Sequence, residues 1–288
     1  MLDNLCFYNH YGNGDIFESR EFVREITAKL PANNYIYYIA RPPRLMLDIP
    51  EILTDNVNFP PFLRNDRAFH RVNNDLYINT WIGRDSKYVL PGSACTLEKL
   101  YEMYNDILGE INGSKLDKEP IDYLTTVNYS LFDISKINEF MESNLNSKKV
   151  YINNGLVYSL QADNFSMNDS IVRLADKYKN ILFFTSDLVY IDRDNIINAN
   201  DFTQSSVNLM ELSYLSTFCD MIIGKNSGPH VVTWTRENCF SNKINITFSY
   251  KKECEHFVYS TPITMKKYWT SSTDAFTFID DIIGKELV

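Results

Sequence analysis

A short segment in the last third of the chain has the residue types of a phosphate-binding loop. The apolar run Met221-Ile222-Ile223 ends in Gly224-Lys225-Asn226-Ser227-Gly228, and Pro229-His230 lead into a second apolar run. This order is typical of a buried strand, a tight loop and the first turn of a helix. A helix start carries unpaired backbone N–H groups and partial positive charge, so it can hold phosphate. Gly228 would allow close backbone approach, and Lys225 could add a positive charge.

The same pattern also fits a strand-to-helix connection that binds nothing. The residues that flank the loop are therefore needed to choose between the two interpretations. A helix predicted over residues 207–218 leads directly into the strand. Within it, Glu211 could accept hydrogen bonds from ribose hydroxyls, or it could simply be a solvated charge on the helix. A nucleotide site would need both the loop and this helix, which favours the phosphate-binding interpretation.

A glycine-bearing loop near the N-terminus is the second candidate site. Gly12-Asn13-Gly14-Asp15 follows a predicted strand over residues 5–8 and precedes helical spacing that begins at Ile16. The carboxylate of Asp15 could act as a general base if a hydroxyl lies within hydrogen-bond reach. It could equally cap the helix, and the two roles are compatible. His10 is a weaker alternative base.

Other polar residues follow predicted strands and could meet a ligand there, because open α/β sheets bind ligands at the carboxyl ends of their strands. Asn154 and Gly155 end a strand predicted from residue 150. Arg41 and Arg44 follow the strand predicted over residues 35–40, beside Pro42-Pro43, and could contact an anionic acceptor. Surface loop charges are the alternative for the two arginines.

Composition excludes several classes of protein. The formal net charge of -9 over 288 residues argues against nucleic acid or an anionic membrane surface as the main partner. The five cysteines show no CxxC spacing, which argues against zinc and against a disulfide framework. Neither a signal peptide nor a run of about 20 apolar residues is present, so we expect a cytoplasmic protein without a transmembrane segment.

Apolar runs alternate with helical patterns along both halves of the chain. Such alternation predicts an α/β fold with parallel sheets, here two Rossmann-like domains facing a cleft. We expect one domain over residues 1–146, which contains the Asp15 loop, and a second over residues 147–288, which contains the loop at Gly228 and would be the nucleotide-binding domain if that loop holds phosphate. The last predicted helix, about residues 273–287, could pack back on the first domain.

Two segments resemble a known family. Leu209-Met210-Glu211-Leu212, together with the run from Ile223 to His230, is similar to the donor-binding segment of GT-B glycosyltransferases. The nearest likeness is the ADP-heptose:lipopolysaccharide heptosyltransferase family, in which a Leu-x-Glu-Leu helix precedes a strand and an Asp-Thr/Ser-Gly-Pro loop with a nearby His. This chain has Asn226 in place of the usual Asp, and His230 follows the proline directly where the family usually inserts a residue.

The N-terminal loop strengthens the resemblance. Gly12-Asn13-Gly14-Asp15-Ile16 is similar to the family's first loop, where the Asp is proposed to deprotonate the acceptor hydroxyl. The resemblance therefore implies a catalytic Asp15 and an acceptor site formed by Gly12, Asn13, Gly14, Arg41 and Arg44. It implies a donor site formed by Glu211, Lys225, Asn226, Ser227, Gly228, Pro229, His230, Asn154 and Gly155.

The function that this resemblance implies is a glycosyltransferase of polysaccharide biosynthesis. It would move a sugar from a nucleotide-diphosphate donor to a glycan or lipopolysaccharide-type acceptor, with inversion, without a metal or other cofactor, and with peripheral membrane contact allowed. Two alternatives stay open. One is a nucleotide-sugar epimerase of similar architecture, and the other is a non-catalytic domain that binds a nucleotide or glycan, which Asn226 would favour.

Overall fold

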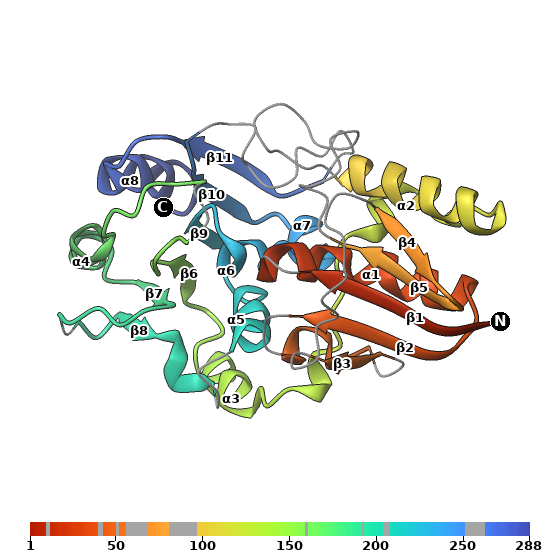
Figure 1. The fold of residues 1–288 in the computed structure, drawn as a ribbon. Coiled ribbons are helices and arrows are strands. Elements are labelled where there is room, and N and C mark those ends of the chain that lie inside the picture. The colour runs from red at the N-terminus through yellow and green to blue at the C-terminus, as the bar shows by residue number, and fades with distance from the viewer. Residues whose placement is uncertain are drawn as a thin grey trace. The chain divides into compact units, whose positions relative to one another are not determined.

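The computed structural model of the protein describes residues 1–9, 12–39, 43–49, 52–55, 68–80, 97–158, 161–191, 193–203, 208–250 and 263–288. Among these, residues up to Asn128 form one compact unit and residues from Tyr129 onward form a second. Each unit contains one sheet of mainly parallel strands with helices on it (Figure 1). The predicted fold class, two α/β domains, is confirmed, whereas the cleft between them stays a prediction.

The first unit is built on a five-stranded sheet. Its elements are β1 (Leu2–Asn9), α1 (Asn13–Lys29), β2 (Ala32–Ile39), η1 (Pro43–Met46), β3 (Leu53–Asp55), β4 (Phe69–Val72), β5 (Asp75–Asn79), α2 (Leu97–Asn112) and η3 (Pro120–Tyr123). The strand order is β3-β2-β1-β5-β4. All neighbours pair in parallel except β4, which pairs antiparallel with β5. The exception arises because only Asn73 and Asn74 connect β4 to β5, which is too short for a parallel crossover, and Asn73 adopts the positive φ of 55° in this tight turn.

Aromatic stacking fixes the helices of the first unit. The Phe22 ring on α1 lies between Tyr104 of α2 and Tyr123 of η3, with ring centroids 4.6 and 4.5 Å apart. All three rings are almost fully buried. Because α1 joins β1 to β2, this packing holds the start of α1, and hence Asp15, at the carboxyl end of β1.

The second unit contains a six-stranded, entirely parallel sheet. Its elements are η4 (Tyr129–Leu131), α3 (Ser135–Ser143), β6 (Lys148–Asn153), α4 (Asn168–Lys177), β7 (Ile181–Thr185), β8 (Ile196–Asn198), η5 (Ala199–Phe202), α5 (Leu209–Ser216), β9 (Met221–Lys225), α6 (Gly228–Val231), α7 (Arg236–Cys239), β10 (Ile244–Phe248), β11 (Lys266–Thr270) and α8 (Ala275–Glu286).

The strand order of this sheet, β8-β7-β6-β9-β10-β11, reverses at its centre. The chain runs outward from β6 to β7 and β8, then returns to place β9 on the other side of β6. Loops that leave β6 and β9 therefore depart in opposite directions and leave a crevice at the carboxyl ends of these two strands. Open α/β sheets bind their ligands in such a crevice.

Alternating side chains of β6 divide the core of the second unit into two layers. Val150 and Ile152 pack with α4 and α8 on one face, whereas Tyr151 packs with α3 and α5 on the other. The last helix, α8, thus buries its apolar side on the sheet of its own unit. The second unit begins at Tyr129, earlier than the expected boundary at 146, because Ile137 and Met141 of α3 belong to its core.

The close packing of α6 on β9 generates a test of the fold. A Cβ atom at Gly224 would lie 2.4 Å from Nδ1 and 2.7 Å from Cγ of the buried His230 ring. We expect Gly224→Ala to lower the free energy of unfolding by about 1–3 kcal/mol, because overpacking forces the ring or the backbone to move. Chemical denaturation followed by circular dichroism measures it.

Gly109→Ala is the matched control. Gly109 lies within α2, and a Cβ atom there meets no other group within 4 Å. Alanine has the higher helix propensity, so this variant should be more stable than the wild type by up to about 1 kcal/mol. Equal effects of the two substitutions would contradict the described contact between β9 and His230.

Candidate functional site

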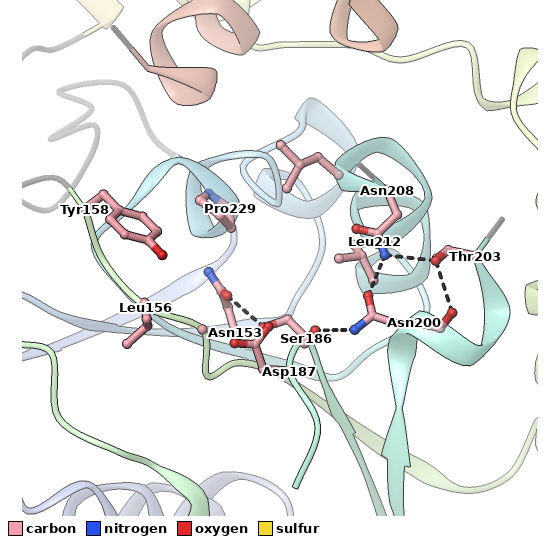
Figure 2. A pocket seen from close by; sticks show the side chains of 12 residues that line it. Asn153, Leu156, Tyr158, Ser186, Asp187, Asn200, Thr203, Asn208, Leu212 and Pro229 are labelled. Atoms are coloured by element: carbon pink, nitrogen blue, oxygen red, sulfur yellow. Dashed lines mark hydrogen bonds between the residues drawn. The ribbon is translucent and has the colours of Figure 1, made fainter. Parts of the chain in front are cut away.

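A cavity of about 670 Å³ opens at the carboxyl edge of the second sheet, where the strand order reverses. Segments that follow β6, β7, β8 and β9 all contribute to it (Figure 2). Its lining residues are Asn153, Gly155, Leu156, Tyr158, Ser186, Asp187, Asn200, Thr203, Asn208, Leu209, Leu212 and Pro229. The cavity is large enough for a substantial part of a nucleotide-sized ligand.

Amide and hydroxyl side chains form a connected chain along one wall of this cavity. Asn208 Nδ2 donates to Asn200 Oδ1 at 2.5 Å and to Thr203 Oγ1 at 2.9 Å. Asn200 Nδ2 in turn donates to the backbone oxygen of Ser186 at 2.6 Å (Figure 2). Ser186 Oγ donates to Asn153 Oδ1 at 2.9 Å. The wall is therefore oriented before any ligand arrives, which lowers the entropy cost of binding.

The charge of the lining is unusual for a site that would hold an anion. Among the described lining residues there is no Lys, Arg or His, and Asp187 is the one carboxylate. Tyr158 and Leu156 add exposed aromatic and aliphatic surface beside the amides. This combination suits hydroxyl-bearing or amide-bearing rings, such as a sugar or a nucleoside, because amides both donate and accept hydrogen bonds.

The structure confirms the strand, loop and helix turn predicted around Gly228, and it places Pro229 and Gly155 in the cavity lining. Ser227 is the N-cap residue of α6, but its hydroxyl donates to the backbone oxygen of Lys225 at 3.0 Å. A ligand would thus meet the backbone of this turn.

Three predicted donor residues lie in the protein core and outside the cavity lining. His230 Nε2 lies 3.1 Å from Thr247 Oγ1, and the ring packs over Gly224. The backbone N–H of Asn226 donates to the oxygen of Phe248 at 2.8 Å, and the residue is fully buried. Glu211 is also fully buried, because it lies on the inner side of α5, whereas Leu209 and Leu212 of that helix line the cavity.

The remaining predicted donor residues, Asn154 and Lys225, line a second cavity of about 420 Å³. Asn154 Oδ1 accepts a hydrogen bond from the backbone N–H of Asp187 at 2.9 Å, and its Nδ2 donates to Asn168 Oδ1 at 3.2 Å. These bonds tie the loop after β6 to the loop after β7 and to the start of α4.

In the first unit, Asp15 lies within the first turn of α1. The helix begins at Asn13 with Gly12 as its N-cap residue, so the alternative in which Asp15 is the N-cap is wrong. A Cβ atom at Gly12 would lie 2.4 Å from Asp15 Oδ2, so the carboxylate folds back over this glycine. The Asp15 residue is mostly buried, and the resulting desolvation of its carboxylate raises the pKa of Asp15 to about 6.

Glu18 follows Asp15 by one helical turn and was missed by sequence reasoning. Burial, and then the charge of Asp15, raise the pKa of Glu18 well above its ordinary value. Among the described residues, Glu18 Oε1 has no hydrogen-bond partner. The i, i+3 spacing of the two carboxylates was a signal that could have revealed the pair.

A hydroxyl cluster lies behind this carboxylate pair. Tyr37 Oη bonds to Ser19 Oγ at 3.2 Å and to Thr80 Oγ1, and Asn9 Nδ2 donates to Thr80 Oγ1 at 3.3 Å. Asn9 and Thr80 mark the carboxyl ends of β1 and β5. The first unit therefore also gathers its polar groups at the carboxyl edge of its sheet.

The predicted acceptor residues are described only in part. Gly12 caps α1, and Asn13 and Gly14 are its first two residues. Arg44 lies in η1, but its side chain is outside the description, and Arg41 and His10 lie outside the described residues altogether.

In the described parts of the chain, no helix is long and apolar enough to cross a membrane. No group of three or more His, Cys, Asp or Glu side chains there is placed to hold a metal ion.

Comparisons with known proteins give matches only at the level of structure. No protein-family model and no curated protein matches the sequence. A glycosyl transferase family 9 protein from Veillonella parvula DSM 2008 aligns over 99% of this chain and 91% of its own, with 12% identity and a TM-score of 0.51. The E. coli heptosyltransferase WaaC with ADP aligns over 98% and 99%, with 7% identity and a TM-score of 0.51.

The same E. coli enzyme with ADP-2-deoxy-2-fluoro heptose aligns over 98% of this chain and 99% of its own, with 7% identity and a TM-score of 0.50. The chain has the fold of these glycosyltransferases. The resemblance inferred from two short motifs is thereby confirmed for the architecture, over nearly the whole chain. At such low identity, the agreement concerns the fold alone.

The buried carboxylate of Glu18 predicts a specific pH dependence of stability. Because its pKa is higher in the folded than in the unfolded chain, the folded state binds the proton more tightly, and stability falls as pH rises above the ordinary carboxyl pKa of 4.5. Glu18→Gln removes this penalty. Its free energy of unfolding, measured by urea denaturation, should exceed that of the wild type by more at pH 8 than at pH 5.

Glu21→Gln serves as the comparison. Glu21 lies on the same helix, forms an ion pair with Arg24, and accepts a hydrogen bond from Thr126 N at 3.0 Å. This variant should be less stable than the wild type at both pH values. A Glu18→Gln variant that is destabilised at pH 8 would show that its carboxylate has stabilising partners.

Proposed function

We propose that the protein is a glycosyltransferase that moves a sugar from a nucleotide-diphosphate donor to a glycan or lipopolysaccharide-type acceptor. The observation that carries the proposal is the amide-lined cavity at the reversal of strand order in the second unit. The fold that the chain shares with the glycosyltransferases described above supports it, since WaaC was solved with ADP and with an ADP-sugar analogue.

The donor would lie along the wall formed by Asn153, Ser186, Asn200 and Asn208. Side-chain amides and hydroxyls would bind the hydroxyl groups of the ribose or of the sugar. At the turn that begins α6, Pro229 has no N–H, and the N–H groups of His230 and Val231 donate to Ser227 O, so the backbone N–H of Gly228 would be the group that meets the diphosphate.

Asp15 would be the base in the transfer step. Its carboxylate takes the proton of an acceptor hydroxyl, and the oxygen attacks the anomeric carbon of the donor. The bond from that carbon to the diphosphate oxygen breaks, and the diphosphate leaves with the electron pair. Attack from the opposite face gives inversion. A pKa of about 6 suits this task, because the group is ionised at neutral pH and remains a moderate base.

We propose that the reaction needs neither a metal ion nor another cofactor. The backbone N–H of Gly228, together with the amides of the cavity wall, would stabilise the negative charge that develops on the leaving diphosphate, which is the role that a divalent cation serves in other enzymes. Turnover should therefore persist in the presence of EDTA.

Substitution of Asp15 separates donor binding from transfer. Asp15→Asn should reduce acceptor-dependent release of nucleoside diphosphate by about 10²- to 10⁴-fold, because general base catalysis is lost, with donor affinity unchanged. Asp169→Asn, an exposed aspartate in the first turn of α4, should behave as the wild type. Coupled release assays and isothermal titration measure the two quantities.

The same assays separate the alternatives. Release of a free epimer without acceptor would identify a nucleotide-sugar epimerase. Donor binding with no turnover in the wild type would identify a non-catalytic binding domain. An Asp15→Asn variant that transfers sugar at the wild-type rate would exclude Asp15 as the base.

A further inference from the structure

The cavity that contains Lys225 adjoins the amide-lined cavity. The two share Leu156, which follows β6, and Asp187, which follows β7, among their linings, so they meet at these two loops. The second cavity is also lined by Asn154, Asn164, Phe165, Ser166, Asn168, Leu188, Tyr190 and Lys225. A ligand in the first cavity could therefore extend one of its groups into the second.

Lys225 supplies a buried positive charge to this second cavity. It is the last residue of β9 and only 1% exposed, yet it is one of the residues that line the cavity. Nζ donates to the backbone oxygen of Phe165 at 3.2 Å and lies 5.6 Å from the centroid of the Phe165 ring. An ammonium group has three N–H donors, so an incoming anion could accept the others.

Burial makes this ammonium group energetically costly. Desolvation lowers the pKa of Lys225, and the nearby charge of Asp187 opposes that effect only in part. Removing a cation from water is unfavourable unless hydrogen bonds and an opposite charge replace the lost hydration. A bound oxyanion would supply both, in the form of a short charge-assisted hydrogen bond.

The distribution of charge over the two cavity linings also indicates Lys225 as the position that would attract an anion. Across both cavities, Lys225 is the one Lys, Arg or His side chain among the described lining residues. The amide-lined cavity offers no side-chain cation, so an acidic group of its ligand would be drawn toward Lys225.

We propose that the cavity around Lys225 is an oxyanion subsite, which binds an acidic group of the ligand held in the amide-lined cavity. The group is either a phosphate of the nucleoside diphosphate or the carboxylate of an acidic sugar, since both present oxygens that accept from an ammonium group. The inference rests on the proposed function of the amide-lined cavity and adds the position of the negative charge.

The test compares three variants in calorimetric titrations. Lys225→Met removes the charge at similar volume, and Lys225→Arg keeps it. Lys149→Met is the matched control, because Lys149 is also a buried lysine, and its Nζ donates to one backbone oxygen, Ser147 O at 2.8 Å, at the opposite end of β6. The probes are ADP, UDP and GDP with their nucleosides, and UDP-glucuronate with UDP-glucose.

If the phosphate occupies the subsite, Lys225→Met should lose about 10- to 100-fold in affinity for the nucleoside diphosphate and keep its affinity for the nucleoside. If the carboxylate occupies it, the loss should appear with UDP-glucuronate and not with UDP-glucose. In either case, Lys225→Arg and Lys149→Met should stay near the wild type, and added salt should weaken binding of the charged probe.

The proposal is overturned if Lys225→Met binds every charged probe as tightly as the wild type. In that case the role of Lys225 is structural, through its hydrogen bond to the backbone oxygen of Phe165. Lys225→Met should then have a lower melting temperature than the wild type. Failure of the proposed function looks different, because the wild type would then bind none of the nucleosides, nucleotides or nucleotide sugars. That result would remove the subsite as well.

Discussion

The reversal of strand order between β6 and β9 is the constraint on which the candidate site depends. Parallel strands deliver their carboxyl ends to one edge of a sheet, and each following loop normally covers the edge as it crosses to the next strand. Between β6 and β9 the crossings run in opposite directions, so the edge stays open. The segments after β6, β7, β8 and β9 border this opening, and their polar residues form the cavity wall.

The polar groups at this edge are held in place by one another. Asn154 joins the loops after β6 and β7, and the chain from Asn208 through Asn200 to Ser186 joins α5 to the same loops. Asn154 and Asn208 are buried, and buried amides whose hydrogen bonds are satisfied cost little to keep dehydrated. Lys225 and the pair Asp15 and Glu18 differ, because burial shifts their pKa values and their charges are poorly compensated. Such groups are typical of functional sites in proteins, although structural networks can produce them as well.

Much of this arrangement could be predicted from the residues. The apolar run before Gly224, and the small polar residues after it, predicted a strand, a loop and a helix turn, and these are present. Which side of an element a residue occupies was harder to predict. Glu211 and His230 lie on the inner faces of α5 and α6, and a short helix has too few turns for periodicity to reveal its inner face. The edge strands β4 and β11 were missed because they are short and carry charges.

The sequence did not predict which residues form the cavity wall, and the reason is different. Asn153, Ser186, Asn200 and Asn208 come from separate segments, and each alone has the composition of an ordinary turn. Only the strand order places them together. In contrast, the Asp15 loop was found from local sequence alone, because Gly12 and Asp15 interact within one helical turn.

Hydrogen exchange with ADP and with UDP-glucose, followed by mass spectrometry, tests the central claim most directly. The opposite edge of the second sheet offers a cavity of about 550 Å³, lined by Lys148, Asp220, Lys243 and Lys266 among others, so the two edges compete as binding sites. We predict protection in residues 153–158, 186–191 and 226–232, with none at the opposite edge. Protection confined to residues 216–220, 242–244 and 264–266 would contradict the account.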